Sequence, residues 1–184
     1  MDEMLKKVIE EVSERPMRSS IITASALMDT MLEQVLKKHL IECANLEEIF
    51  SFQGCLGTFS SKIEMSYALG IISKELRDDL NMYRKIRNKC AHNITITDQT
   101  LNEIKRLTGN FNLLKNVFTI GENEDLLIYT SLEFAVIFVC LIKRLNNIER
   151  LKPFDFEVHD DYLAFKQEDI EFLSKFSETV KRKK

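Results

Sequence analysis

The sequence predicts an all-α fold for two reasons. The 184 residues include only five glycines and two prolines, whereas an all-β fold of this length needs many more turn residues. Apolar side chains also recur at helical spacing along most of the chain. With 45% apolar and 30% charged residues, the composition is that of a folded globular chain rather than a disordered one. We expect a single helical domain over residues 1–184.

Four helices are predicted in the first half of the chain. Residues 2–14 form a short amphipathic helix that stops near a proline. Residues 18–43 form a longer helix whose apolar side holds Ile21, Met28, Leu32, Val35, Leu36, His39 and Cys43. Residues 58–69 form a third helix, and Gly70 is placed to cap its C-terminal end. Ser73 is placed as the N-cap of a fourth helix, over "KELRDDLNMYRKIRNKCA".

The second half is predicted to be helical as well. Thr97 begins a helix of about ten residues, and residues 111–119 are helical or irregular. Residues 131–150 form the most hydrophobic helix, with Ser131 as its N-cap. The stretch "KPFDFEVHDDYLAF" is the least regular and could hold a loop or a short strand, and a terminal helix covers residues 167–182. No repeat or linker divides the chain.

The net charge of −3 argues against a protein that coats duplex nucleic acid, because such proteins carry a broad basic surface. Positive charge is instead concentrated in residues 84–89 and in the tail "KRKK", which we interpret as a solvated end. No helix-turn-helix pattern is visible, so we expect no motif for direct binding of duplex DNA.

The remaining features indicate a cytoplasmic chain without a cofactor or a membrane span. The four cysteines form no CxxC pair and no signal-peptide pattern is visible, which favours reduced thiols. The longest apolar run, residues 126–142, is interrupted by Glu133 and falls short of the ~20 residues that cross a bilayer, so a buried core helix explains it better. Nucleotide-binding and hydrolase motifs are absent, and His39 and Cys43 lack a second ligand pair, so we expect neither a cofactor nor a metal.

One charged residue breaks the pattern of the helix that begins after Ser73. Arg87 falls within the apolar stripe of that helix, which is formed by Leu76, Leu80, Tyr83, Ile86 and Cys90. A guanidinium on the core side of a helix is costly unless it is paired or reaches water, and it cannot lose its charge. Arg87 could therefore clamp a carboxylate, for which Asp29 is the expected partner, or it could line a pocket that binds an anion.

His92 lies near the predicted end of the same helix. Asn88, one turn earlier, is placed to hydrogen-bond the imidazole and select its tautomer. A histidine at a helix C-terminus is also favoured by the helix dipole, without any further role. The residues alone leave both interpretations of His92 open.

The segment "RNKCAH" (87–92) matches the R-N-x3-H form of the R-x4–6-H signature of HEPN domains. With "ASALMDTMLEQVLKKHL" (24–40) and "FSSKIEMSYALGIISKELRDDLNMYRKIRNKCAH" (59–92), it resembles the mannitol operon repressor-like family, an all-helical group related in fold to HEPN domains. The resemblance covers about residues 15–95. It implies an up-and-down helical bundle that commonly dimerises, to which the rest of this chain adds C-terminal helices.

The main hypothesis that follows from this resemblance is metal-independent cleavage of RNA, as in toxin or defence effectors. In active HEPN members, the arginine and the histidine of two protomers face each other across the dimer interface. Here Arg87 would bind the scissile phosphate, His92 would act as general base or acid, and Asn88 would fill the polar position after the arginine. Three neighbouring cations would bind the RNA substrate: Arg84, Lys85 and Lys89.

The alternative hypothesis is a non-enzymatic, mannitol operon repressor-like transcriptional regulator that acts through protein–protein contacts. Many toxin-type HEPN members have a tyrosine two residues after the histidine, where this chain has Ile94. That departure and the negative net charge favour the regulator, whereas the local basic cluster and Arg87 favour RNA cleavage. The expected partners are a second copy of the chain, RNA, and an antitoxin or regulatory protein.

Overall fold

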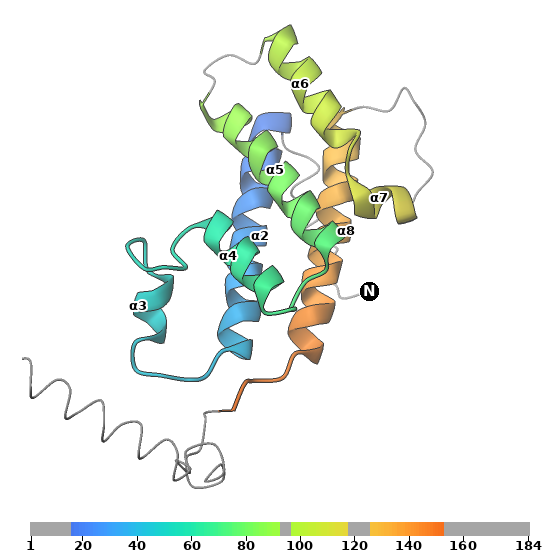
Figure 1. Ribbon diagram of the computed structural model, residues 1–184. Helices are drawn as coiled ribbons and strands as arrows, with labels where there is room; N and C mark the ends of the chain where they lie inside the picture. The colour runs from blue at the N-terminus through green and yellow to red at the C-terminus, as the bar shows by residue number, and fades with distance from the viewer. Residues whose placement is uncertain (1–15, 93–96, 118–125, 153–184) are drawn as a thin grey trace, which may run out of the picture. The chain divides into compact units, whose positions relative to one another are not determined.

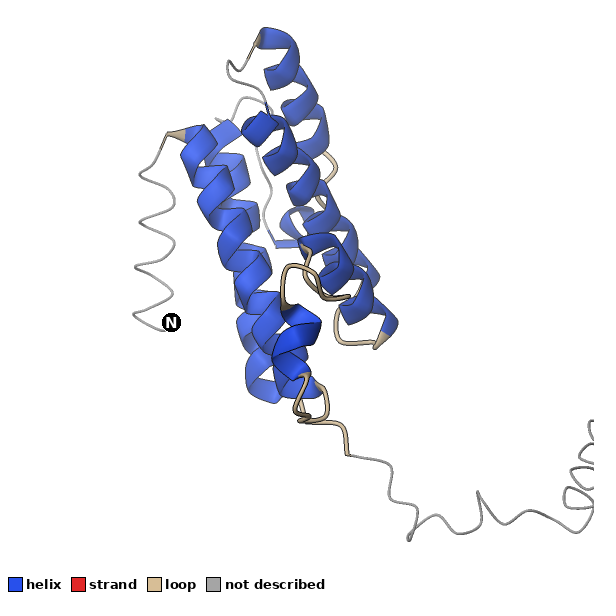
Figure 2. Cartoon of the chain, turned by 90° about the vertical axis from the view of Figure 1, so that its left-hand side faces the viewer, coloured by secondary structure: helices blue, strands red, loops and turns tan. Residues whose placement is uncertain are grey.

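The computed structural model describes residues 16–92, 97–117 and 126–152, which form seven helices and no strand (Figures 1 and 2). The all-α prediction is therefore confirmed. Contacts within the chain group residues 1–151 in one unit and residues 152–184 in another, and all seven helices belong to the first unit. A single domain over the whole chain stays a prediction. The predicted helices over 2–14 and 167–182, and most of the irregular stretch between residues 152 and 166, lie outside the described residues.

Three long helices form the centre of the bundle: α2 (Met17–His39), α5 (Lys74–His92) and α8 (Leu126–Asn147). Helix α2 packs most extensively against α8, and next against α5. Lys38 Nζ donates to the carbonyl oxygen of Leu145 at 2.7 Å, so the C-terminal ends of α2 and α8 meet and the two helices run in the same direction (Figure 1). Helix α5 runs the opposite way, because the carbonyl oxygen of Ala91, near its end, accepts from Arg18 at the start of α2 at 3.5 Å.

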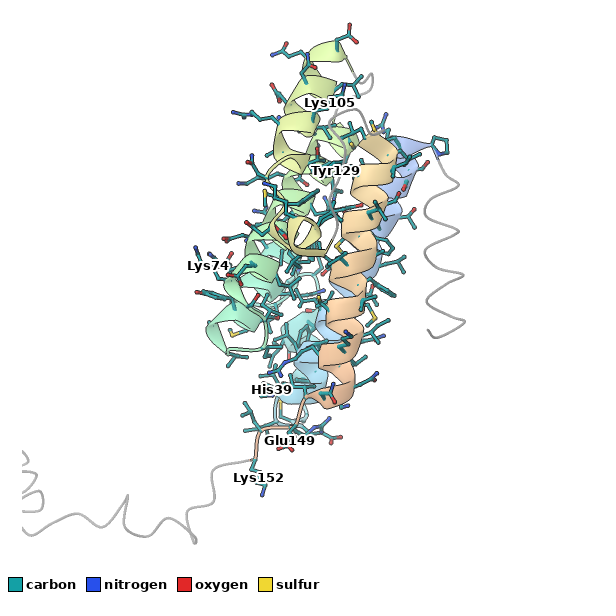
Figure 3. All side chains as sticks on the ribbon, turned by 90° about the vertical axis from the view of Figure 1, so that its right-hand side faces the viewer. His39, Lys74, Lys105, Tyr129, Glu149 and Lys152 are labelled. Carbon is teal, nitrogen blue, oxygen red and sulfur yellow. The ribbon has the colours of Figure 1, made fainter. Side chains whose placement is uncertain are left out.

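The predicted apolar side of α2 is buried from Ile21 to Leu36. The prediction fails beyond that point, because α2 ends at His39 and Cys43 is exposed. His39 Nδ1 lies 2.7 Å from the carbonyl oxygen of Glu149, in the segment after α8 (Figure 3). This contact fastens the end of α2 to the end of α8.

Four shorter helices complete the described part of the chain: α3 (Leu46–Phe50), α4 (Phe59–Ala68), α6 (Asp98–Thr108) and α7 (Asn112–Val117). Hydrogen bonds confirm the predicted starts of two helices. Ser73 Oγ accepts from the N–H of Leu76 at 3.2 Å, and Thr97 Oγ1 accepts from the N–H of Thr100 at 3.2 Å. Gly70, after α4, has a φ of 67°, a left-handed conformation that glycine adopts without strain.

Helix α8 begins at Leu126 rather than at Ser131, so the N-cap prediction is wrong. Ser131 and Glu133 lie inside the helix and are buried, because the apolar segment before them continues the same helix. The length of α8 and its mean hydropathy of 2.0 would also fit a membrane span, a property that it shares with core helices of soluble proteins. It packs against α2 and α7, and its Phe134 and Ile137 are fully buried.

Candidate functional site

Helix α5 carries the predicted site, with the cations Arg84, Lys85, Arg87 and Lys89 and, at its end, His92. The predicted apolar stripe of this helix is confirmed, since five side chains are buried: Leu76, Leu80, Tyr83, Ile86 and Cys90. Successive residues of an α-helix are turned by about 100°, so the four cations cannot share one face. They meet different neighbours in the structure.

Arg87 is half-buried, and its Nη1 donates to Oδ1 of the adjacent Asn88 at 3.0 Å. The expected pair between Arg87 and Asp29 is not formed. Asp29 Oδ1 lies 2.8 Å from Nζ of Lys62 on α4, and the same ammonium lies 2.7 Å from Glu33 Oε2. The physical reason is burial: the side chain of Lys62 is only 6% exposed and needs counter-charges, whereas Arg87 still reaches solvent.

Two carboxylates thus stabilise the buried ammonium of Lys62. Burial by itself lowers the pKa of this group, but the hydrogen bonds to Asp29 and Glu33 outweigh it, so the pKa of Lys62 lies above its usual value. The group links α2, which carries both acids, to α4. Asp29 therefore supports the fold through Lys62, a partner that the sequence pattern did not indicate.

His92 is the last residue of α5 and is exposed. The expected hydrogen bond from Asn88 to His92 is not among those of the described residues, since Asn88 Oδ1 accepts from Arg87 instead. Arg87, Asn88 and His92 thus lie close together along the end of one helix. Their catalytic roles stay predictions, because the composite site needs a second protomer.

Lys89 forms an ion pair with Glu103 on α6. The hydrogen bond from Lys89, and then its charge, lower the pKa of the Glu103 carboxyl below its usual value. This pair fastens the C-terminal half of α5 to α6, so the Lys89 ammonium already has an anionic partner within the chain.

Arg84 and Lys85 line an open groove of about 470 Å³. Helix α5 also contributes Arg77, Asp78, Asn81 and Met82 to the lining. Asn110, in the α6–α7 connection, and Asn112, the first residue of α7, complete it. Neither Arg87 nor His92 lines this groove. The groove therefore includes the predicted substrate-binding cations Arg84 and Lys85 but none of the predicted catalytic residues, whose roles stay predictions.

The hydrogen bonds of the groove begin at Glu64 on α4. Its Oε2 accepts from Arg77 Nε at 2.8 Å, and its Oε1 accepts from Asn81 Nδ2 at 3.0 Å. Arg84 Nε then donates to Asn81 Oδ1 at 3.3 Å. Arg77, Asn81 and Arg84 are spaced i, i+4 and i+7, so helical periodicity could have placed them on one face. No signal in the sequence could have predicted that Asn110 and Asn112, which lie outside α5, also line this groove.

Two further acids, Asp79 on α5 and Glu133 on α8, are fully buried. Asp79 Oδ1 accepts from the backbone N–H and from Nδ2 of Asn112, both at 2.8 Å, and Oδ2 accepts from the N–H of Leu113 at 2.7 Å. Burial, and then the charge of Asp79, raise the pKa of Glu133 to about 9. Glu133 is therefore neutral at pH 7, while Asp79 accepts the hydrogen bonds that hold the start of α7.

Comparison with known proteins shows which family this fold represents. Residues 4–153 match the family model described as mannitol repressor, MtlR. The chain belongs to the mannitol repressor family. This match confirms the resemblance expected from residues 24–40 and 59–92, and it extends well beyond the expected range of about 15–95 to include α8.

A solved structure supports the same fold. The X-ray structure of the MtlR–HPr complex from Escherichia coli contains a chain that aligns with 79% of this chain and 98% of its own length, at a TM-score of 0.55 and 18% sequence identity. No curated protein matches the sequence.

Among the described residues, no group of three or more histidine, cysteine or acidic side chains is placed to hold a metal ion.

Proposed function

We propose that the chain is a non-enzymatic regulator of the mannitol repressor type, which acts by binding another protein. The family match over residues 4–153 carries this proposal, because it includes every described helix. An HPr-type protein is the partner that we infer, since the similar Escherichia coli protein was solved in complex with HPr. The alternative hypothesis from the sequence thus becomes the main one.

The described surface offers one marked apolar contact point. Phe52, in the loop between α3 and α4, is 92% exposed, more than any other large hydrophobic side chain among the described residues. The loop is tightly folded: the N–H of Leu56 donates to the carbonyl oxygen of Ile49 at 2.9 Å, and a Cβ on Gly54 would lie 2.2 Å from that same oxygen. A fixed loop that presents an aromatic ring is typical of a protein-binding anchor.

Titration calorimetry of the full chain with purified HPr, together with size-exclusion chromatography, tests this proposal. Saturable heat and a co-eluting complex are expected. His92→Ala should bind HPr as the wild type does, because the proposed contact point, Phe52, lies in the loop between α3 and α4 and not on α5. Absence of binding to HPr at concentrations of about 100 μM would overturn the inferred partner.

RNA cleavage remains a second candidate function, supported by one observation. The Arg87 guanidinium is half-buried and hydrogen-bonded to Asn88, close along the helix to the exposed His92, so a phosphate and a proton carrier could meet at the end of α5. The mechanism requires a homodimer with two α5 helices at its two-fold axis. Incubation of the chain with total RNA in EDTA should then give fragments that end in 2′,3′-cyclic phosphate. Equal cleavage, or equal absence of cleavage, by the wild type and His92→Ala would exclude this candidate.

A further inference from the structure

The groove lined by Arg84 and Lys85 has more cationic side chains than nearby carboxylates pair with. Arg77 is held by Glu64, with its Nη2 at 2.7 Å from Oε2, and it lies 3.5 Å from Asp78. Arg84 and Lys85, in contrast, form no ion pair with any described residue, and Arg84 uses only Nε, toward Asn81. Two cations with open donors therefore face one groove, in a chain whose net charge is −3.

The opposite side of the groove offers hydrogen-bond acceptors. Asn110 Nδ2 donates to the carbonyl oxygen of Arg106 at 2.9 Å, and Asn112 Nδ2 donates to Asp79 at 2.8 Å. Both amides are thus oriented by their N–H groups, which leaves each Oδ1 as an acceptor without a partner among the described residues. On α5 itself, the carboxylate of Asp78, 39% exposed, adds a third acceptor. Hydroxyl groups are the donors that such a set of oxygens would bind.

A buried carboxylate holds the two sides of the groove, α5 and the segment with Asn110 and Asn112, in place. Asp79, fully buried, accepts from the backbone N–H groups of Asn112 and Leu113 and thereby ties the start of α7 to α5. A site whose polar groups are fixed before binding loses less conformational entropy when a ligand arrives.

Size and lining identify the class of ligand. A volume of about 470 Å³ lies within the range of small-molecule sites, roughly 300–1,000 Å³. Single-stranded nucleic acid is normally bound on aromatic side chains that stack with the bases, and none of the lining residues is aromatic. We propose that this groove binds a small phosphorylated molecule that also carries hydroxyl groups, such as a hexitol phosphate or a sugar phosphate. Arg84 and Lys85 bind the phosphate, and Asp78, Asn110 and Asn112 accept from the hydroxyls.

The site is tested on the full chain by calorimetric titration with a hexitol 1-phosphate, the unphosphorylated hexitol, inorganic phosphate and a single-stranded RNA oligonucleotide. The double variant Arg84→Gln/Lys85→Gln should bind the hexitol phosphate at least about tenfold more weakly, because charge-assisted hydrogen bonds to the phosphate are lost. The control is Lys105→Gln/Lys143→Gln, which removes the same net charge from two exposed lysines outside the groove; Lys105 lies on α6 (Figure 3). It should change the affinity for the hexitol phosphate by less than about twofold.

The proposal is overturned if the hexitol phosphate shows no saturable binding at millimolar concentration, or if inorganic phosphate binds as tightly as the hexitol phosphate does. It is also overturned if both double variants lose affinity equally. Finally, it is overturned if the oligonucleotide binds more tightly than the hexitol phosphate and the Arg84→Gln/Lys85→Gln change abolishes that binding. Circular-dichroism melts check that the variants fold. If the double variant does not fold, Lys85→Gln alone serves, because Lys85 is exposed and has no hydrogen bond to a described residue. In NMR spectra, the side-chain amide signals of Asn110 and Asn112 should shift on addition of the hexitol phosphate.

Discussion

Asp79 and Glu133 lie beside each other in the interior, one on α5 and one on α8, and neither side chain has any exposure to solvent. Two buried carboxyl groups cannot both carry charge at low cost, so one is kept protonated. The N–H groups at the start of α7 donate to Asp79, and burial and then the charge of Asp79 raise the pKa of Glu133, so Glu133 holds the proton.

The first prediction concerns pH. The pKa of Glu133 is raised from about 4.5 when unfolded to about 9 when folded, so its contribution to stability is complete below pH 4.5 and is lost as the pH rises toward 9. The free energy of unfolding should fall by several kcal/mol over this interval. Glu133→Gln should flatten the decline and be more stable than the wild type near pH 9. Denaturant melts at pH 5, 7 and 9 measure this, and parallel profiles for the two proteins would contradict it.

The second prediction concerns the start of α7. Asp79→Ala removes the acceptor of two backbone N–H groups and one side-chain amide, and should cost about 2 kcal/mol or more, since each hydrogen bond to a charged group contributes roughly 1.5–3 kcal/mol. Hydrogen exchange should accelerate most at the amides of Asn112 and Leu113. The neighbouring Asp78→Ala is the control and should change stability by less than about 0.5 kcal/mol, because Asp78 makes only a long pair with Arg77.

The third prediction separates the true partner of Asp29 from the expected one. Lys62→Ala should cost about 3–5 kcal/mol, because it leaves Asp29 and Glu33 without their buried counter-charge. Arg87→Ala should cost about 1 kcal/mol or less, since Arg87 is half-buried and donates only to its neighbour Asn88. A double-mutant cycle should show coupling between Asp29 and Lys62. Coupling of similar size between Asp29 and Arg87 would show that the pairing is wrong.

The fourth prediction concerns the loop after α3. Phe52→Ala should leave the melting temperature nearly unchanged, because the ring is 92% exposed and contributes little to the core. It should weaken the binding of HPr by about tenfold or more if the ring is buried in the complex. Ile128→Ala, at an exposed apolar residue of α8, is the matched control. Unchanged HPr affinity in Phe52→Ala, with binding intact in the wild type, would place the contact elsewhere on the surface.

Helical periodicity was sufficient to predict most of the described helices. The stripe from Leu76 to Cys90 is buried as expected, and Ser73 and Gly70 stand at the predicted helix ends, because caps and apolar spacing are local properties. The start of α8 was misplaced because Ser131 has the side chain of an N-cap, while burial among neighbouring helices allows the segment from Leu126 to continue the helix.

The candidate site was harder to predict, because its contacts join distant segments. Asp79 lies in the apolar stripe of α5 just as Arg87 does, and Glu133 interrupts the longest apolar run, so both departures were visible in the sequence. The ion-pair partner of Asp29, in contrast, could not be predicted from the sequence. Whether Lys62 or Arg87 binds Asp29 depends on how α2, α4 and α5 pack. The groove likewise forms only because Asn110, in the α6–α7 connection, and Asn112, at the start of α7, lie beside α5.

The parallel course of α2 and α8 also affects how the chain folds during synthesis. The contacts that join their ends connect residues separated by 107 and 110 positions, as in Lys38 with Leu145 and His39 with Glu149. Contacts of such long range form late, because a long loop must close first. A nascent chain that has emerged from the ribosome only as far as Gly109 therefore exposes the apolar side of α2, because α8, against which α2 packs most extensively, is not yet present. We expect ribosome-bound chains of that length to bind chaperones that recognise apolar helices, and to be released once α8 has emerged.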